Sequence, residues 1–179
     1  QRFKINGDAT MSASLLGRRT IEFNFTAIPD TPPTITVIAP PNKNDNDSLS
    51  VTYAWQDDYG IASGLVEITG IIKDEKTYAH PPLLDPPTLI LGFQPDPRKG
   101  ENKQQIIYEN SLWSGLSVEA RLKVQDDMQQ TGTSAVFRFT LPQRFFVNPL
   151  ARALDEQRKN LVSAPDDVKT VLTAIDALM

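Results

Sequence analysis

The alternation of apolar and charged residues is the feature that most constrains the fold of this chain. It is clearest in one run, which reads Val118, Glu119, Ala120, Arg121, Leu122, Lys123 and Val124. A period of two places the apolar side chains on one face of an extended strand and the charged ones on the other. This run is therefore predicted to be a strand with one buried face and one face in water.

Similar runs recur between residues 34 and 141. The predicted strands are residues 34–39, 49–56, 65–72, 88–93, 105–109, 118–124 and 135–141. About seven short strands separated by turn signals are typical of a β-sandwich. We therefore expect a mainly β fold, an immunoglobulin-like antiparallel β-sandwich over residues 34–141, with Tyr53 and Trp55 in its core. The proline-rich stretches 80–87 and 94–100 are predicted to be surface loops.

Residues 1–28 are interpreted as the terminal strands of a preceding β domain. Residues 3–5 and 21–28 have strand character, and Ile21, Phe23 and Phe25 alternate with polar residues. Two strands alone are marginal in water, so they are expected to belong to a larger sheet. The absence of an initiator Met suggests a piece of a longer protein. Residues 29–33 contain three prolines and are predicted to be a stiff linker.

The pattern changes to helical spacing in residues 142–179. Asn148 followed by Pro149 predicts a helix start with Asn148 as the N-cap. The residues expected to form its apolar stripe are Leu150, Leu154 and Leu161. A second helix is predicted to start near Ser163, which would form a capping box with Asp166. We therefore expect a C-terminal helical hairpin whose apolar faces need a partner.

Composition excludes several classes of function. The chain has no Cys and one His, His80, so thiolate catalysis, disulfides and cysteine-based zinc sites are excluded and a catalytic triad is disfavoured. Its 18 basic residues are scattered among 22 acidic ones, which argues against a nucleic-acid partner. No apolar run reaches the roughly 18 residues needed to span a bilayer. The chain is therefore expected not to be an enzyme.

Two acidic turns suggest the most specific site. Asp57 and Asp58 follow the second strand of the sandwich, and Asp126 and Asp127 follow the penultimate strand. In an immunoglobulin-like order both loops lie at one pole, which the linker carrying Asp30 also reaches. Because Ca²⁺ binds six to eight oxygens from several loops, these residues are candidate calcium ligands. The alternative is that the aspartates only cap their own turns.

Two further interpretations remain open. Trp113 lies in a turn-like stretch and is predicted to be an exposed aromatic, which a carbohydrate- or peptidoglycan-binding module would use for stacking. A carboxylate-based hydrolase would instead use Asp58 and Asp127 as acid and base. Neighbouring side chains of an extended chain point to opposite faces, so each acidic pair supplies only one carboxylate to such a site.

Several stretches resemble an uncharacterised family of large, membrane-anchored envelope proteins of alphaproteobacteria that carry a domain of unknown function. They are residues 28–35 (Ile-Pro-Asp-Thr-Pro-Pro-Thr-Ile), 57–61 (Asp-Asp-Tyr-Gly-Ile), 141–142 (Leu-Pro) and 146–158 (Phe-Val-Asn-Pro-Leu-Ala-Arg-Ala-Leu-Asp-Glu-Gln-Arg). The resemblance implies N-terminal transmembrane helices, a periplasmic region with immunoglobulin-like domains and a long helical C-terminal part. It implies no catalytic residues.

These observations favour a non-catalytic structural or protein-interaction module of a larger periplasmic protein tethered to the inner membrane. The expected partners are other proteins or neighbouring domains of the same chain, including a strand-mediated dimer through residues 1–28, because unpaired strand edges bind other strands. Contact with a membrane is expected only through segments outside this sequence. No cofactor is expected apart from the Ca²⁺ of the acidic turns.

Overall fold

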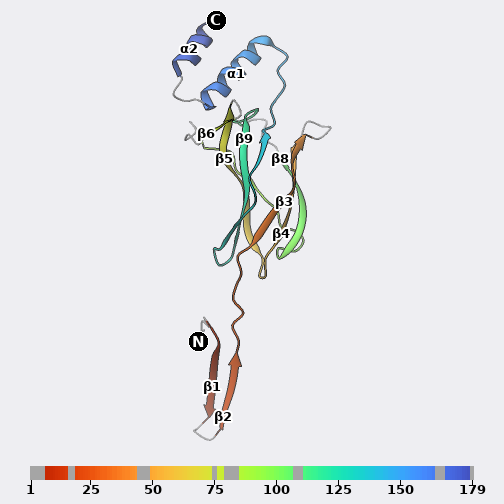
Figure 1. Cartoon of the computed structure of the whole chain (residues 1–179), viewed down its shortest axis with the longest axis vertical. Coiled ribbons are helices and arrows are strands. Elements are labelled where there is room, and N and C mark those ends of the chain that lie inside the picture. Colours follow the sequence, from red (N-terminus) through yellow and green to blue (C-terminus); the bar gives the residue numbers. More distant parts are fainter. Residues whose placement is uncertain are drawn as a thin grey trace. The chain divides into compact units, whose positions relative to one another are not determined.

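A computed structural model describes residues 7–15, 19–43, 49–73, 76–78, 85–106, 111–163 and 168–177 of the chain (Figure 1). The predicted strand at residues 3–5 and the single histidine, His80, lie outside these residues. The chain forms two compact units, Gln1–Thr31 and Pro32–Met179. It is mainly β, with several antiparallel sheets and two C-terminal helices, as the sequence predicts.

The first unit contains an antiparallel hairpin of β1 (Ala9–Leu15) and β2 (Arg19–Phe25). One face consists of three cross-strand apolar pairs, Ala9 with Phe25, Met11 with Phe23, and Ala13 with Ile21. The opposite face is polar, with Thr10 donating a hydrogen bond to Asn24 Oδ1 at 2.9 Å. Strand β1 was not predicted, because its alanines, serines and threonine give a weak apolar alternation.

The second unit begins with a three-stranded sheet in the order β3-β4-β8. Its strands are β3 (Thr34–Lys43), β4 (Leu49–Gln56) and β8 (Lys99–Ile106). The pairing of β3 with β4 shifts register between Val37 and Ala39 and again between Ala39 and Asn42. Pro40 and Pro41 lie within the second shift, and neither can donate a ladder hydrogen bond.

The other sheet is centred on β5 (Ile61–Lys73) and β9 (Ser117–Asp126), which pair along most of their lengths. Strand β6 (Lys76–Tyr78) pairs with β5 at one edge, and β10 (Thr131–Thr133) pairs with β9 at the other. Strand β7 (Leu89–Ile90) also pairs with β5, and β11 (Phe137–Thr140) also pairs with β9. The two sheets pack on one shared hydrophobic core, which is consistent with a β-sandwich.

Inward-facing rows from β4 and β9 form the centre of that core. The row of β4 is Val51, Tyr53 and Trp55, and the row of β9 is Val118, Ala120, Leu122 and Val124. The predicted core positions of Tyr53 and Trp55 are therefore confirmed. The rings of Tyr53 and Trp55 both pack against Phe93, with centroids 6.2 and 5.2 Å away at steep interplanar angles, the edge-to-face geometry that aromatic pairs prefer.

Of the seven predicted strands, the one at residues 49–56 has the predicted bounds, and three of the others differ most clearly. The strand predicted at residues 105–109 overlaps β8 at residues 105–106, and residues 107–109 lie outside the described part of the chain. Strand β8 begins at Lys99 and therefore also includes the end of the predicted loop 94–100. The strand predicted at 88–93 is reduced to Leu89–Ile90. Strand β5 begins at Ile61 rather than at residue 65. In β8 the ladder with β4, rather than apolar alternation, holds a mostly polar segment in extended form.

The C-terminal helices are α1 (Pro149–Ser163) and α2 (Val168–Asp176), which contact each other. The predicted N-cap is confirmed, since Asn148 Oδ1 accepts a hydrogen bond from the Leu150 N–H at 2.8 Å. Ser163 is the last residue of α1, and its hydroxyl donates to Lys159 O, so it does not start α2 as predicted. Its predicted partner, Asp166, lies outside the described residues. No helix in the described ranges has the length and apolar character of a membrane span.

The hydroxyl of Tyr53 fixes the chain after β7 to the first sheet. It donates to Gly92 O at 2.8 Å and accepts from Gly92 N at 3.0 Å, while burial raises the pKa of Tyr53 and keeps it protonated. We expect Tyr53→Phe to lower the free energy of unfolding by about 1–3 kcal/mol, because both Gly92 groups lose a partner. Urea unfolding measures this loss. The exposed Tyr59→Phe is the control, and equal losses would contradict this role.

Gly132 allows β10 to lie against the start of the second unit. A Cβ atom at this position would lie 2.0 Å from the carbonyl oxygen of Pro33. We expect Gly132→Ala to cost about 1–3 kcal/mol of stability, since backbone must move to accommodate the methyl group. The control is Gly92→Ala, whose Cβ would come no closer than 3.6 Å to Asn102. Thermal unfolding of both variants tests this, and an unchanged Tm for Gly132→Ala would refute it.

Candidate functional site

Asp57 and Asp126 extend the two inward rows of the core by one position each, at the same end of the sandwich. Asp57 lies two residues after Trp55, in the turn that follows β4. Asp126 lies two residues after Val124, at the end of β9. Both aspartates are buried, with 6% and 4% of their surface exposed. The β5–β9 ladder pairs Ile61 with Asp126, so the turn that begins at Asp57 leads directly to the strand beside Asp126.

One oxygen of each buried carboxylate caps its own turn. Asp57 Oδ2 accepts hydrogen bonds from the backbone N–H groups of Tyr59 at 3.1 Å and Gly60 at 2.5 Å. Gly60 has a φ of 120°, a conformation that favours glycine. Asp126 Oδ1 accepts from Gln130 N at 2.8 Å. The capping role proposed as the simpler interpretation of the acidic turns is therefore present at both residues.

The second oxygen of each carboxylate does not cap a turn. Asp57 Oδ1 and Asp126 Oδ2 are buried and have no hydrogen-bond partner among the described residues. Their sequence neighbours Asp58 and Asp127 are exposed. The expectation that each acidic pair places only one carboxylate inward is therefore confirmed.

The full five-residue calcium site stays a prediction. Across the ranges that the structure describes, no group of three or more His, Cys, Asp or Glu side chains is arranged to hold a metal ion. Asp30 belongs to the first unit, whereas the other four aspartates belong to the second. What the second unit does bring to one end of its core is the pair Asp57 and Asp126.

Trp113 is buried, contrary to the prediction of an exposed aromatic. Only 3% of its surface is accessible, and it belongs to the core cluster. The turn around it is closed by the Ser114 N–H bonding to Ser111 O and by Gly115 at a φ of 77°. These turn residues were the reason for the wrong prediction, because the turn folds over the end of the core with Trp113 inside. Trp113 therefore cannot serve as a platform for stacking a sugar.

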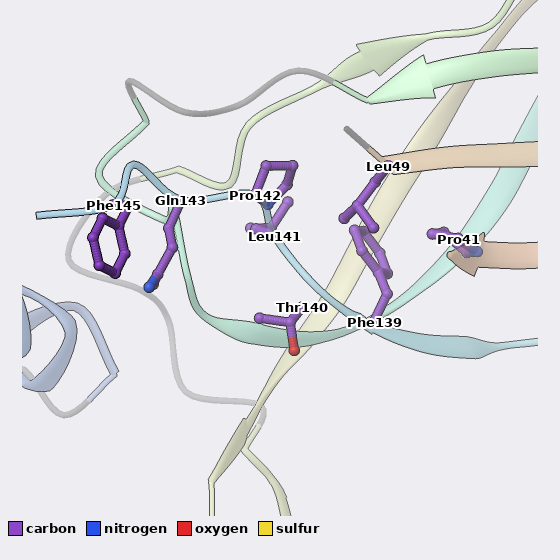
Figure 2. A pocket seen from close by; sticks show the side chains of 8 residues that line it. All are labelled: Pro41, Leu49, Phe139, Thr140, Leu141, Pro142, Gln143 and Phe145. Carbon is purple, nitrogen blue, oxygen red and sulfur yellow. The ribbon is translucent and has the colours of Figure 1, made fainter. Parts of the chain in front are cut away.

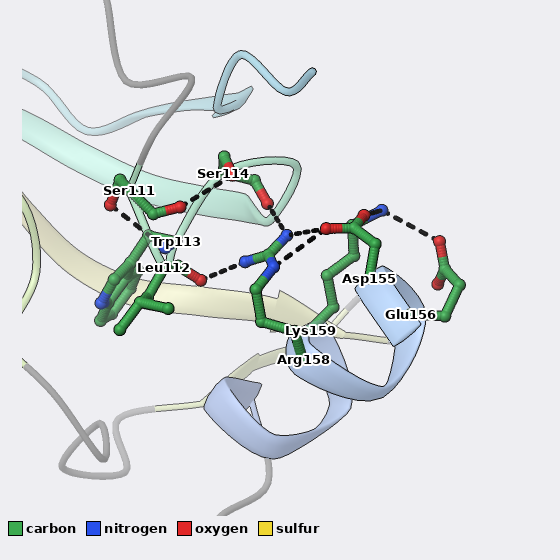
Figure 3. A network of polar contacts seen from close by, with 8 residues as sticks. All are labelled: Ser111, Leu112, Trp113, Ser114, Asp155, Glu156, Arg158 and Lys159. Atoms are coloured by element: carbon green, nitrogen blue, oxygen red, sulfur yellow. Dashed lines mark hydrogen bonds and ion pairs between the residues drawn. The ribbon is translucent and has the colours of Figure 1, made fainter. Parts of the chain in front are cut away.

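Helix α1 contacts the same turn through Arg158 (Figure 3). The guanidinium of Arg158 donates to the carbonyl oxygens of Leu112 and, at 2.6 Å, Ser114, and it forms an ion pair with Asp155 at 2.8 Å. Lys159 also pairs with Asp155, at 3.3 Å. We call these contacts the Arg158 clamp. The side chains of Arg158 and Asp155 are 21% and 11% exposed, so the ion pair is partly buried.

Helix α1 therefore contacts the sandwich through Arg158 and Val162, and two leucines of its predicted apolar stripe are exposed. Val162 is the residue of α1 that enters the core cluster. Leu150 and Leu154 of the predicted stripe are 49% and 44% exposed. A charged side chain, Arg158, is used for docking, and these two leucines are exposed to solvent. Sequence periodicity located this stripe but could not show which face meets the sandwich.

A pocket of about 540 Å³ lies where the two sheets meet at an edge (Figure 2). Leu49 comes from the first sheet, Phe139 from the second, and Phe145 from the segment that leads to α1. The other lining residues are Pro41, Thr140, Leu141, Pro142 and Gln143. None of these side chains is titratable, so the pocket has the chemistry of an apolar binding surface and lacks acid–base groups of its own.

Comparison with known proteins bears out the coarser part of the resemblance, an uncharacterised family with a domain of unknown function. The family model described as a domain of unknown function (DUF4175) matches residues 1–179. No curated protein and no solved structure matches the chain. The match covers both units, the buried aspartates and the Arg158 clamp, and it carries no assignment of activity. The chain belongs to the family defined by this domain of unknown function, DUF4175.

Proposed function

We propose that this chain is a non-catalytic structural module that spaces and orients parts of a larger, membrane-anchored periplasmic protein. The observation that carries the proposal is the Arg158 clamp, which fixes a helix to the end of a sandwich and leaves Leu150 and Leu154 exposed. A helix held in this way has a defined direction and an apolar surface for a protein partner or for further chain.

The strand order supports an immunoglobulin-like sandwich as the core of the module. Consecutive strands β4 and β5 lie in different sheets, and so do β8 and β9. Such crossings between two sheets are characteristic of Greek-key sandwiches of this class. Modules of this kind serve in many proteins as spacers, and their function is set by attached surfaces, not by the fold.

The hairpin of the first unit supports a second contact with protein. Met11, Ile21 and Phe23 are exposed on its apolar face. An isolated two-stranded hairpin is marginally stable, whereas a face of this kind is stabilised by covering it with another sheet. We propose that a neighbouring domain covers this face, or that a strand-mediated dimer forms through the edges of the hairpin. Periplasmic location and anchoring to the inner membrane belong to the same proposal and rest on the family resemblance.

The clamp can be tested by replacing its arginine. We expect Arg158→Met to speed amide hydrogen exchange in residues 149–163 by about tenfold or more, because hydrogen bonds from a charged donor contribute about 1.5–3 kcal/mol. Exchange in β4 and β9 should remain slow. Arg152→Met is the matched control, since Arg152 is an exposed residue of the same helix. Equal exchange in both variants and in the unmodified chain would refute the orienting role of the clamp.

Cell-wall assays separate this proposal from its competitors. A structural module is expected neither to sediment with peptidoglycan nor to hydrolyse it, because Trp113 is buried and unable to stack on sugars. Hydrolysis that disappears in Asp58→Asn or Asp127→Asn would replace the proposal with a carboxylate-based hydrolase. Saturable binding without hydrolysis would replace it with a carbohydrate-binding module.

A further inference from the structure

The end of the sandwich core at Asp57 and Asp126 contains an electrostatic imbalance. Each residue follows an inward row, in which alternate side chains point between the sheets, so both carboxylates project into the same layer. Each uses one oxygen to cap a turn and buries the other without a partner. Turn capping accounts for one oxygen of each carboxylate and does not explain why the other oxygen is buried.

In the part of the chain that the structure describes, these carboxylates have no basic partner. Among the described residues, no Lys or Arg forms an ion pair with Asp57 or Asp126. Arg98 approaches through its backbone, where its carbonyl oxygen accepts from Asp57 N at 2.7 Å, but its guanidinium pairs with Asp96 at 3.3 Å. Burying ionised carboxylate oxygens without a counter-charge is strongly unfavourable. Native structures resolve such a situation with a hydrogen-bond donor, a water molecule or a cation.

We propose that Asp57 and Asp126 bind a divalent cation of the calcium type through Asp57 Oδ1 and Asp126 Oδ2. Two carboxylates balance the charge of such a cation, and both ligand atoms are oxygens, which Ca²⁺ prefers. Backbone carbonyls and water complete the six to eight ligands. Ca²⁺ suits this end of the core better than Mg²⁺, because its coordination tolerates ligands from irregular turns, whereas Mg²⁺ demands a near-ideal octahedron. The cation would join the turn after β4 to the turn after β9.

The site is independent of the Arg158 clamp, so the two proposals can fail separately. Asparagine is the appropriate substitution at both ligands, because its side-chain oxygen can still accept the capping hydrogen bonds. It replaces the unpartnered oxygen by an amide NH₂, which is a donor and cannot bind a cation. Asp58→Asn and Asp127→Asn are matched controls that make the same charge change at the exposed neighbouring positions.

The experiment titrates the purified full chain with calcium chloride and follows thermal unfolding. At a calcium concentration about a hundredfold above the dissociation constant, we expect Tm to rise by about 5–10 °C, and we expect a chelator to reverse the rise. Asp57→Asn and Asp126→Asn should lose this response, and both controls should keep it. Magnesium chloride should give a smaller shift than calcium. An unchanged Tm in the unmodified chain, or equal loss in the control variants, would overturn the proposal.

Terbium luminescence provides a second measurement that does not depend on stability. Trp55 precedes Asp57 by two residues, about 7 Å along an extended strand, so its excitation should sensitise a terbium ion bound at this site. Calcium should displace the terbium and quench the emission. If Asp57→Asn fails to fold, the signal of the unmodified chain still decides the question. Absence of sensitised emission there, together with an absent calcium response, would mean that no cation binds.

Discussion

The packing of the inward rows of β4 and β9 into one core is the interaction on which the rest of the second unit depends. Val51 and Tyr53 of one row, and Val118 and Leu122 of the other, are completely buried. Each such side chain contributes about 1.5–3 kcal/mol relative to exposure. Because these rows fix the relative position of the sheets, they also fix where each strand ends. The two buried aspartates and the turn containing Trp113 are placed by that packing.

The helical tail depends on the sandwich in a different way. Its polar contact consists of directional hydrogen bonds from Arg158 to two backbone carbonyls, with Asp155 of the same helix pairing the guanidinium, and Val162 adds an apolar contact with the core. Directional contacts of this kind specify the orientation of the helix more strictly than an apolar interface of similar size does. The guanidinium must align with two carbonyls and a carboxylate at once. The leucines left outside are then available to whatever follows or binds the module.

The alternating pattern was sufficient to predict the strands with one apolar and one polar face. Strand β9 shows it from Val118 to Val124, and the predicted bounds of β4, Leu49–Gln56, are those of the structure. Strand β8 was displaced in the prediction because its Lys, Glu and Gln residues are held by the ladder with β4, a contact between residues far apart in sequence. Strand β1 was missed for a different reason, because its alanines, serines and threonine give only a weak apolar signal.

The candidate site was predictable in part. An immunoglobulin-like strand order predicted that the turns of Asp57 and Asp126 lie at one pole, but it did not indicate which carboxylate of each acidic pair is buried. Trp113 was placed wrongly because a turn composed of Ser, Trp and Gly looks solvent-exposed when its neighbours are unknown. Arg158 lies in the stretch 146–158 that carries the family resemblance, but the sequence assigned it no contact, since an arginine on a helix is usually solvated. Its hydrogen bonds to Leu112 and Ser114 reveal its role.

The placement of β3 and β11 in different sheets has a mechanical consequence. The chain enters the second unit through β3 and leaves the sandwich through β11, and these strands contact each other although no ladder joins them in the described residues. Tension applied to both ends of the unit would therefore pass through the β3–β4 and β9–β11 ladders and also across the apolar layer between the sheets. Resistance to stretching would then depend on the packing of that layer as well as on the two ladders, so methyl groups and backbone amides would share the load.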